Sequence, residues 1–115
     1  MSDLTDLRDQ MRDFTAERGW EQFHDPKSVL LALVGEVGEL AELFQWLPAD
    51  EAAARAAQEP LHARVGEELA DVLLYLVRLA DVVGVDLADA AVRKLAAGRE
   101  RFPATEVYGT APERT

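Results

Sequence analysis

Apolar residues recur at intervals of three and four along most of the chain, which is the spacing of one face of an α-helix. Most Gly and Pro residues fall between these segments, where they end or start helices. The pattern predicts an all-α fold. The long helices are expected over residues 3–17, 26–47 and 61–83 and from a cap at Asp86 to Gly98, and the Ala-rich stretch 49–59 is expected as a short helix or, alternatively, a mobile connection.

Several helix ends have side chains suited to capping. Ser2 and Asp25 stand just before the first two helices, and Pro26 suits the first position of the second one. Gly19 and Gly84 follow the first and third helices, where a left-handed residue commonly ends a helix.

The third predicted helix is apolar around most of its circumference. One seam contains Val65, Leu69, Val72, Leu76, Leu79 and Val83, and a second sector contains Leu73, Leu74, Val77 and Ala80. Such a helix must be buried on two sides, and four helices in 115 residues do not easily surround it. We therefore expect a four-helix bundle that assembles as a dimer or a dimer of dimers. The alternative cover is the chain's own tail or Ala-rich segment.

Composition narrows the possible partners. The chain has 22 acidic residues against 12 Lys and Arg, a net charge of −10, and no basic run, which argues against binding a nucleic acid polymer. It has no Cys, no apolar stretch long enough to cross a membrane and no signal-peptide pattern at its start, so we expect a soluble cytoplasmic protein. One domain is expected over residues 1–103, followed by a surface-bound or disordered tail, 104–115.

Two predicted helices each carry a pair of acids three residues apart: Glu36 with Glu39, and Glu68 with Asp71. Residues at this spacing share one helix face, and clustered carboxylates suit hard cations such as Mg²⁺ or Mn²⁺. Only Glu68 has a basic residue one helical turn away. The alternative is ordinary solvated surface charge. Helical phase puts Glu68 and Asp71 beside the apolar seam of the third predicted helix. On the second predicted helix it puts Glu36 at the edge of the apolar stripe and Glu39 almost opposite the centre of that stripe.

At this point a family resemblance becomes specific. The chain resembles the dCTP pyrophosphatase branch of the MazG-like all-α nucleoside triphosphate pyrophosphohydrolases through four ordered segments: Trp20-Glu21-Gln22-Phe23-His24, Glu36-Val37-Gly38-Glu39, Phe44-Gln45-Trp46 and Glu68-Leu69-Ala70-Asp71. The resemblance implies that Glu36, Glu39, Glu68 and Asp71 hold Mg²⁺, with Mn²⁺ as an alternative, and serve hydrolysis of a triphosphate to a nucleoside monophosphate and pyrophosphate.

The same resemblance implies a substrate site. Its expected nucleoside contacts are Trp20, His24, Trp46 and Tyr75, and its expected phosphate contacts are Lys94 and Arg101. The competing interpretations are core packing for the aromatic residues and surface charge for the basic ones. The pattern differs from that of the family at Met11, where animal enzymes of the branch carry His, and at Gly98, where many relatives carry Asn.

Two classes of function follow. The first is nucleotide-pool sanitation by hydrolysis of dCTP or a modified dCTP, with dUTP or phosphoribosyl-ATP as other substrates for the same chemistry. The second is a non-catalytic helical module that forms homo-oligomers and whose acids merely solvate its surface.

Overall fold

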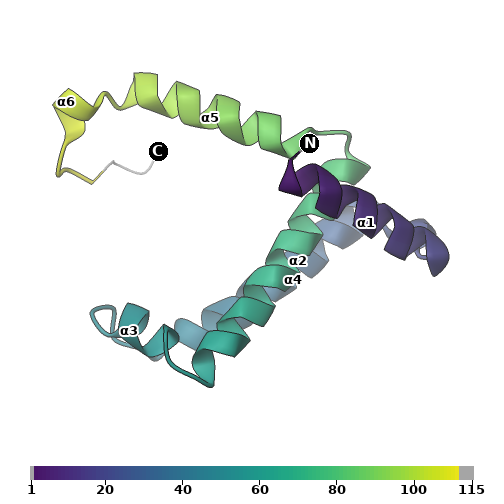
Figure 1. Cartoon of the computed structure of the whole chain (residues 1–115), viewed down its shortest axis with the longest axis horizontal. Helices are drawn as coiled ribbons and strands as arrows, with labels where there is room; N and C mark the ends of the chain where they lie inside the picture. The colour runs from purple at the N-terminus through teal and green to yellow at the C-terminus, as the bar shows by residue number, and fades with distance from the viewer. Residues whose placement is uncertain (1, 112–115) are drawn as a thin grey trace.

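A computed structural model describes residues 2–111, and within this range the chain is helical with no strand. The all-α prediction is confirmed. The elements, labelled in Figure 1, are α1 (Asp3–Glu17), the 3₁₀ turn η1 (Glu21–Phe23), α2 (Pro26–Phe44), α3 (Ala52–Ala56), α4 (Leu61–Val82), α5 (Leu87–Arg101) and α6 (Ala104–Val107).

The expected caps are present. The side chains of Ser2, Asp25 and Asp86 each accept a hydrogen bond of 3.1 Å from the backbone N–H three residues further on. These bonds satisfy backbone donors that have no partner within the helix. Gly19 and Gly84 adopt positive φ angles of 65° and 75°, a conformation that costs glycine little.

Some helix boundaries differ from the predictions. The second helix ends at Phe44 rather than residue 47, because the chain tightens into a turn in which the Leu47 N–H donates to the Phe44 carbonyl. The fourth long helix continues three residues past Gly98 to Arg101. The Ala-rich stretch forms the short helix α3, as predicted. The expected tail contains the one-turn helix α6, and its last four residues, 112–115, lie outside the described part of the chain.

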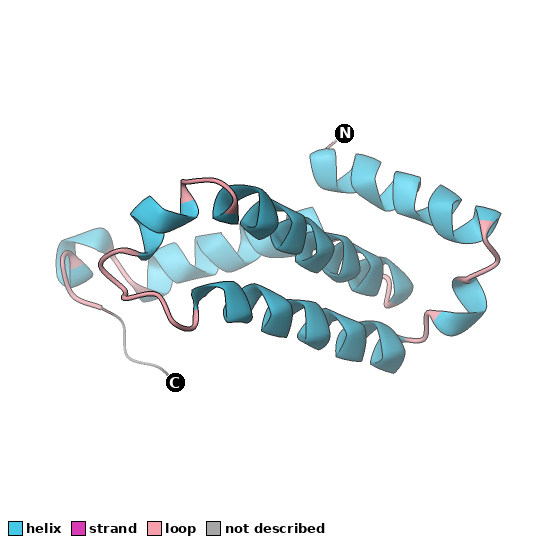
Figure 2. Ribbon diagram, turned by 90° about the horizontal axis from the view of Figure 1, so that it is seen from below, coloured by secondary structure: helices cyan, strands magenta, loops and turns pink. Residues whose placement is uncertain are grey.

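Helices α2 and α4 form the centre of the molecule and lie side by side, running in opposite directions (Figure 2). A stripe on α2 turns toward α4 and is buried or half-buried; its residues are Val29, Ala32, Leu33, Glu36, Leu40 and Leu43. Helix α1 packs across the far end of α4, where Val77 and Ala80 are buried. Glu36 therefore lies in the main helix–helix interface of the described chain.

Helix α5 leaves this centre (Figure 1). Its main contact is with α1, and the apolar side chains of Val92 and Leu95 are 65% and 62% exposed. The four long helices therefore do not close into one bundle within the described chain, which differs from the predicted four-helix bundle because α5 packs mainly against α1. The assembly into a dimer or a dimer of dimers stays a prediction.

Helix α4 also keeps an uncovered apolar face. Leu69, Leu73 and Leu76 are 52%, 37% and 38% exposed, even though α2, α1 and α3 all contact this helix. Neither α3 nor the described part of the tail covers these three residues. Among the described helices, none is long and apolar enough to cross a membrane.

Candidate metal centre and adjoining cavity

The carboxylates approach each other because α2 and α4 pack closely. Glu36 belongs to the stripe of α2 that faces α4, and Leu33 and Leu40, one turn away on either side, are half-buried with it. Glu68 occupies the matching position on α4, between the half-buried Val65 and Val72. Apolar packing on both sides of each acid thus holds two carboxylates in the same interface.

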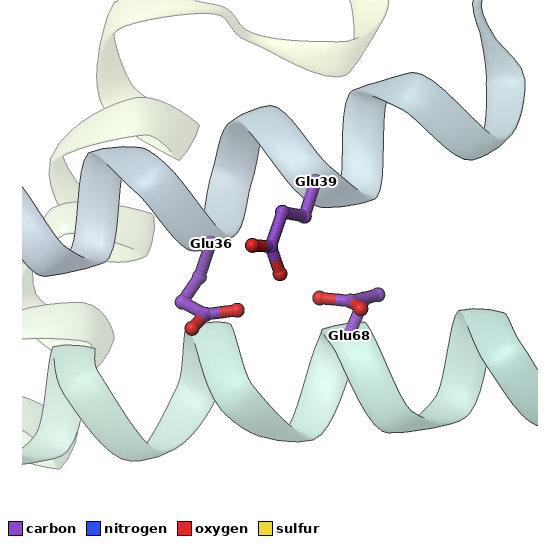
Figure 3. A group of neighbouring side chains, drawn as sticks. All are labelled: Glu36, Glu39 and Glu68. Atoms are coloured by element: carbon purple, nitrogen blue, oxygen red, sulfur yellow. The ribbon is translucent and has the colours of Figure 1, made fainter.

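Three of the four predicted acids form a cluster. Glu36, Glu39 and Glu68 each offer a carboxylate oxygen, and these oxygens lie within 4.8 Å of one another (Figure 3). The side chains from α2 and α4 point into the space between the two helices. Glu39, which helical phase alone placed on the opposite side of α2, is therefore part of the cluster, because its side chain bends toward α4.

The electrostatics of the cluster are unfavourable without a cation. Burial, followed by the negative charges of Glu39 and Asp71, raises the pKa of Glu36 to about 7. Burial and the same two charges also raise the pKa of Glu68. A carboxylate that is partly removed from water beside other carboxylates favours its neutral form, and a bound cation reverses that preference.

Two oxygen atoms in the cluster make no hydrogen bond to the described residues. They are Oε2 of Glu36 and Oε2 of Glu68, and both are inaccessible to solvent. Buried polar atoms are normally paired, since an unpaired one costs about 1–3 kcal/mol. Unpaired carboxylate oxygens on two adjacent helices, within a cluster of three acids, suit a hard divalent cation.

Asp71 has a different position from the other three acids. It does not belong to the cluster of close oxygens, yet its charge raises the pKa of both Glu36 and Glu68. Asp71 is also one of the residues that line a neighbouring cavity. Asp71 therefore stands between the carboxylate cluster and that cavity.

The cavity has a volume of about 220 Å³ and lies between α1, η1 and α4. Its lining residues are Met11, Phe14, Thr15, Trp20, His24, Asp71, Leu74 and Tyr75. The Phe14 and Trp20 rings meet edge to face, with centroids 5.7 Å apart. Three of the predicted nucleoside contacts, Trp20, His24 and Tyr75, are thus brought together around one mostly apolar space.

The other three predicted substrate residues are placed elsewhere. Trp46 follows α2, is 86% exposed and does not line the cavity. Lys94 borders a shallow groove on α5, and the guanidinium of Arg101 lies over the Phe102 ring, 5.1 Å from its centroid. Because α5 diverges from α2 and α4, one chain does not bring these basic residues to the carboxylates.

Beside the cavity, the structure reveals a charged network that we did not predict from the sequence. Arg78 is only 9% exposed; its Nε–H donates to Nδ1 of His24 at 2.9 Å, and its Nη1 lies 3.4 Å from Asp81. Arg12 donates to the same carboxylate. A signal was present in the sequence: Arg78 and Asp81 stand three apart within an otherwise apolar segment, so charge there needs a partner.

Gly35 and Gly38, on either side of Glu36, are not explained by packing within the chain. A Cβ built at either position meets no atom within 4 Å. The space beside both glycines is therefore open among the described residues.

Comparison with known proteins places this architecture in a family. A family model described as MazG-like matches residues 32–111, a stretch that includes all four acids. The chain belongs to the MazG-like family.

Named relatives support the same assignment. Over 112 residues the chain is 50% identical to dCTP pyrophosphatase 1 of Rattus norvegicus, and over 101 residues it is 52% identical to that of Homo sapiens. These matches cover 97% and 88% of this chain but only 66% and 59% of the two relatives, so the chain spans about two thirds of their length or less.

A solved structure shows the same fold. The crystal structure of a pyrophosphatase from Archaeoglobus fulgidus superimposes with a TM-score of 0.80 at 35% identity, covering 90% of this chain and 94% of that one. The similarity thus covers nearly the whole of both chains, including the helices on which the site is built.

Proposed function

We propose that this MazG-like chain hydrolyses a nucleoside triphosphate, with dCTP or a modified dCTP as its substrate, to the nucleoside monophosphate and pyrophosphate. The observation that carries the proposal is the cluster of Glu36, Glu39 and Glu68, whose oxygens lie within 4.8 Å beside an aromatic cavity. The naming of the mammalian relatives as dCTP pyrophosphatases supports the choice of base.

Glu36, Glu39, Glu68 and Asp71 are the residues that hold the divalent cation, Mg²⁺ or Mn²⁺, in this proposal. When bound, such an ion neutralises triphosphate charge and lowers the pKa of a coordinated water. Glu36 or Glu39 accepts a proton from the attacking water. One water is consumed, and a P–O bond in the bridge between the α- and β-phosphates breaks. The nucleoside monophosphate keeps the α-phosphate, and the β- and γ-phosphates leave together as pyrophosphate.

The cavity is the proposed site for the base. Its volume of about 220 Å³ is below the roughly 300–1,000 Å³ of sites that enclose a whole drug-sized ligand, so it suits the base rather than the entire nucleotide. Trp20 and Tyr75 provide aromatic faces for stacking. Asp71 borders both regions, so a nucleotide with its base in the cavity extends its phosphates toward the acids.

Self-association is the second part of the proposal. The exposed faces of α4 (Leu69, Leu73, Leu76) and α5 (Val92, Leu95) are apolar, and large exposed apolar faces usually mark interaction sites. We propose a homodimer or a dimer of dimers in which helices of separate chains complete a four-helix bundle. Trp46, Lys94 and Arg101 contact substrate only if this assembly brings them to the carboxylates.

The test is to incubate the purified protein with Mg²⁺ and each of dCTP, 5-methyl-dCTP, dUTP and the other canonical triphosphates, and to measure monophosphate and pyrophosphate. Faster turnover of the cytosine nucleotides is expected. Failure to hydrolyse any triphosphate, with Mg²⁺ or Mn²⁺, would refute the proposed activity and favour the non-catalytic module. Release of orthophosphate and a diphosphate would instead refute the proposed position of cleavage.

A further inference from the structure

The hydrogen bond between Arg78 and His24 has a chemical consequence for the cavity. A guanidinium N–H always donates and never accepts, so the Nε–H of Arg78 can bond to Nδ1 of His24 only if that nitrogen presents its lone pair. The proton of the neutral ring must then be on Nε2. The bond, 2.9 Å long, thus selects one of the two tautomers of His24.

Arg78 is held firmly enough to enforce this choice. It is 9% exposed on α4, and its Nη1 lies 3.4 Å from the carboxylate of Asp81, one turn further along the helix. Asp81 is itself fixed by Arg12 of α1, whose Nε donates to it at 2.8 Å. Two helices therefore position the guanidinium before any ligand arrives, as preorganised sites require.

The neutral ring is also the favoured form. Burial, followed by the positive charge of Arg78, lowers the pKa of His24. The only hydrogen bond that the His24 side chain makes with described residues is the one at Nδ1. His24 is one of the residues that line the cavity, and Nε2–H is the ring donor that remains for a ligand there.

We propose that Arg78 is a positioning residue that fixes His24 as a hydrogen-bond donor at Nε2, directed at an acceptor on the ligand's base, such as a carbonyl oxygen or an unprotonated ring nitrogen of a pyrimidine. The proposal rests on the proposed function for the nature of the ligand. Arg78 itself does not line the cavity. Through Arg78, His24 recognises the edge of the base that carries a hydrogen-bond acceptor.

The chain's other histidine provides an internal control. Nδ1 of His62 lies 3.2 Å from the backbone carbonyl of Ala56, and a carbonyl oxygen only accepts. His62 must therefore donate from Nδ1, the opposite of His24. With two histidines in the chain, ¹⁵N-histidine labelling gives two ring systems, which a His62→Gln variant assigns.

The experiment is an NMR measurement on the full chain at neutral pH. We expect Nδ1 of His24 to be unprotonated and to show a scalar coupling to Nε of Arg78 across the hydrogen bond, while Nδ1 of His62 is protonated. Titration with dCMP, which has no pyrophosphate bond to hydrolyse, should shift the Nε2–H signal of His24 saturably and leave the ring signals of His62 unchanged. A protonated Nδ1 on His24, or no response of its ring to dCMP, would overturn the inference.

Arg78→Met then tests positioning. Asp81 keeps its bonds from Arg12, so the fold should survive, and dCMP affinity should fall about three- to tenfold, the effect of one hydrogen bond. Arg78→Leu, which likewise has no donor for Nδ1 of His24, serves the same purpose should the Met variant fail to fold. The matched control is Arg93→Met, which replaces an exposed arginine of α5. This variant should bind dCMP with the affinity of the parent. Unaltered affinity in the Arg78 variants would overturn the proposal.

The two proposals fail separately. If the parent hydrolyses no triphosphate while the two tautomers, the dCMP response and the loss of affinity in Arg78→Met are as described, the activity is refuted and the role of Arg78 stands. If dCTP is hydrolysed while Arg78→Met leaves KM for dCTP and dCMP affinity unchanged, the role of Arg78 is refuted and the activity stands.

Discussion

Helix α4 carries charge on two of its faces, and the two faces treat charge in opposite ways. Toward α1, Asp81 receives hydrogen bonds from Arg12 and an ion pair from Arg78. Toward α2, Glu68 meets Glu36 and Glu39, and its Oε2 has no partner among the described residues. The pKa values differ in the same way. The pKa of Asp81 is lowered, chiefly by the hydrogen bond from Arg12, whereas the pKa values of Glu36 and Glu68 are raised.

This difference separates stabilising charge from functional charge. A paired carboxylate contributes to folding, because its ionised form is favoured in the folded chain. Clustered carboxylates without a cation work against folding and persist where a ligand compensates for them. The same helix therefore provides a stabilising network at one end and a destabilised site near its middle.

The largest effect is expected from neutralising the clustered face. Glu39→Gln or Asp71→Asn should lower kcat for dCTP at least about 100-fold, the usual scale for losing one electrostatic contact at a reacting centre, while circular dichroism stays unchanged. Glu67→Gln, an exposed acid of the same helix with no assigned role, is the control. Retained activity in both site variants would remove the cation assignment.

The next effect concerns the cation and pH. The folded pKa of Glu36, about 7, is above its usual 4.5, so the folded state binds the proton more tightly. In the metal-free chain, the contribution of Glu36 to folding stability should therefore fall as the pH rises from about 4.5 to 7. Mg²⁺ competes with that proton, so it should raise Tm more at pH 8 than at pH 6. When the Mg²⁺ concentration is about a hundredfold above its Kd, the rise in Tm should be about 10 °C.

Glu36→Gln sharpens the same comparison. The metal-free variant should be at least as stable as the parent, because one of the repelling charges is gone, and Mg²⁺ should no longer raise its Tm. Thermal scans with EDTA and with Mg²⁺ measure both. A variant that is less stable than the parent in EDTA would show that the cluster contributes to folding without a cation.

The paired face should respond in the opposite direction. Asp81→Ala should destabilise the chain by about 2 kcal/mol, below the roughly 3–5 kcal/mol of a fully buried pair because Arg12 is half exposed. The lowered pKa of Asp81 means that its contribution is present above its usual pKa of 3.8 and is lost as pH falls through the folded value. Urea unfolding at pH 7 and pH 3 measures this; an equal loss at both pH values would contradict it.

The smallest effect is expected on α5. Arg93 and Asp89 form an exposed i,i+4 pair at 2.9 Å, with side chains 80% and 51% accessible. Arg93→Ala should change stability by less than about 0.5 kcal/mol in urea unfolding. A larger loss would mean that α5 is covered in solution, in which case sedimentation should show the proposed dimer or tetramer.

Much of the local structure was predictable because it depends on neighbours in sequence. The caps at Ser2, Asp25 and Asp86 and the stop at Gly19 follow from residue chemistry within one turn, and the structure confirms them. The pairing of acids three apart was equally local. The MazG-like resemblance was likewise carried by ordered short segments, and the comparisons confirm it.

Non-local packing decided the rest. Helical phase put Glu39 opposite the apolar stripe of α2, and only the path of its side chain toward α4 brings it to Glu36 and Glu68. The bond between Arg78 and His24 joins residues 54 positions apart, so no periodicity reveals it. Likewise, the divergence of α5 depends on how it contacts α1 rather than on its own sequence pattern.

The sequence by itself determined the helices, their caps, the acids available for a cation and the family, because each depends on local propensity or on short ordered motifs. The tertiary structure decided which acids share one space, that the aromatic cavity adjoins them through Asp71, and which tautomer His24 adopts. Those outcomes depend on distances of a few ångströms between separate helices, and only packing fixes them.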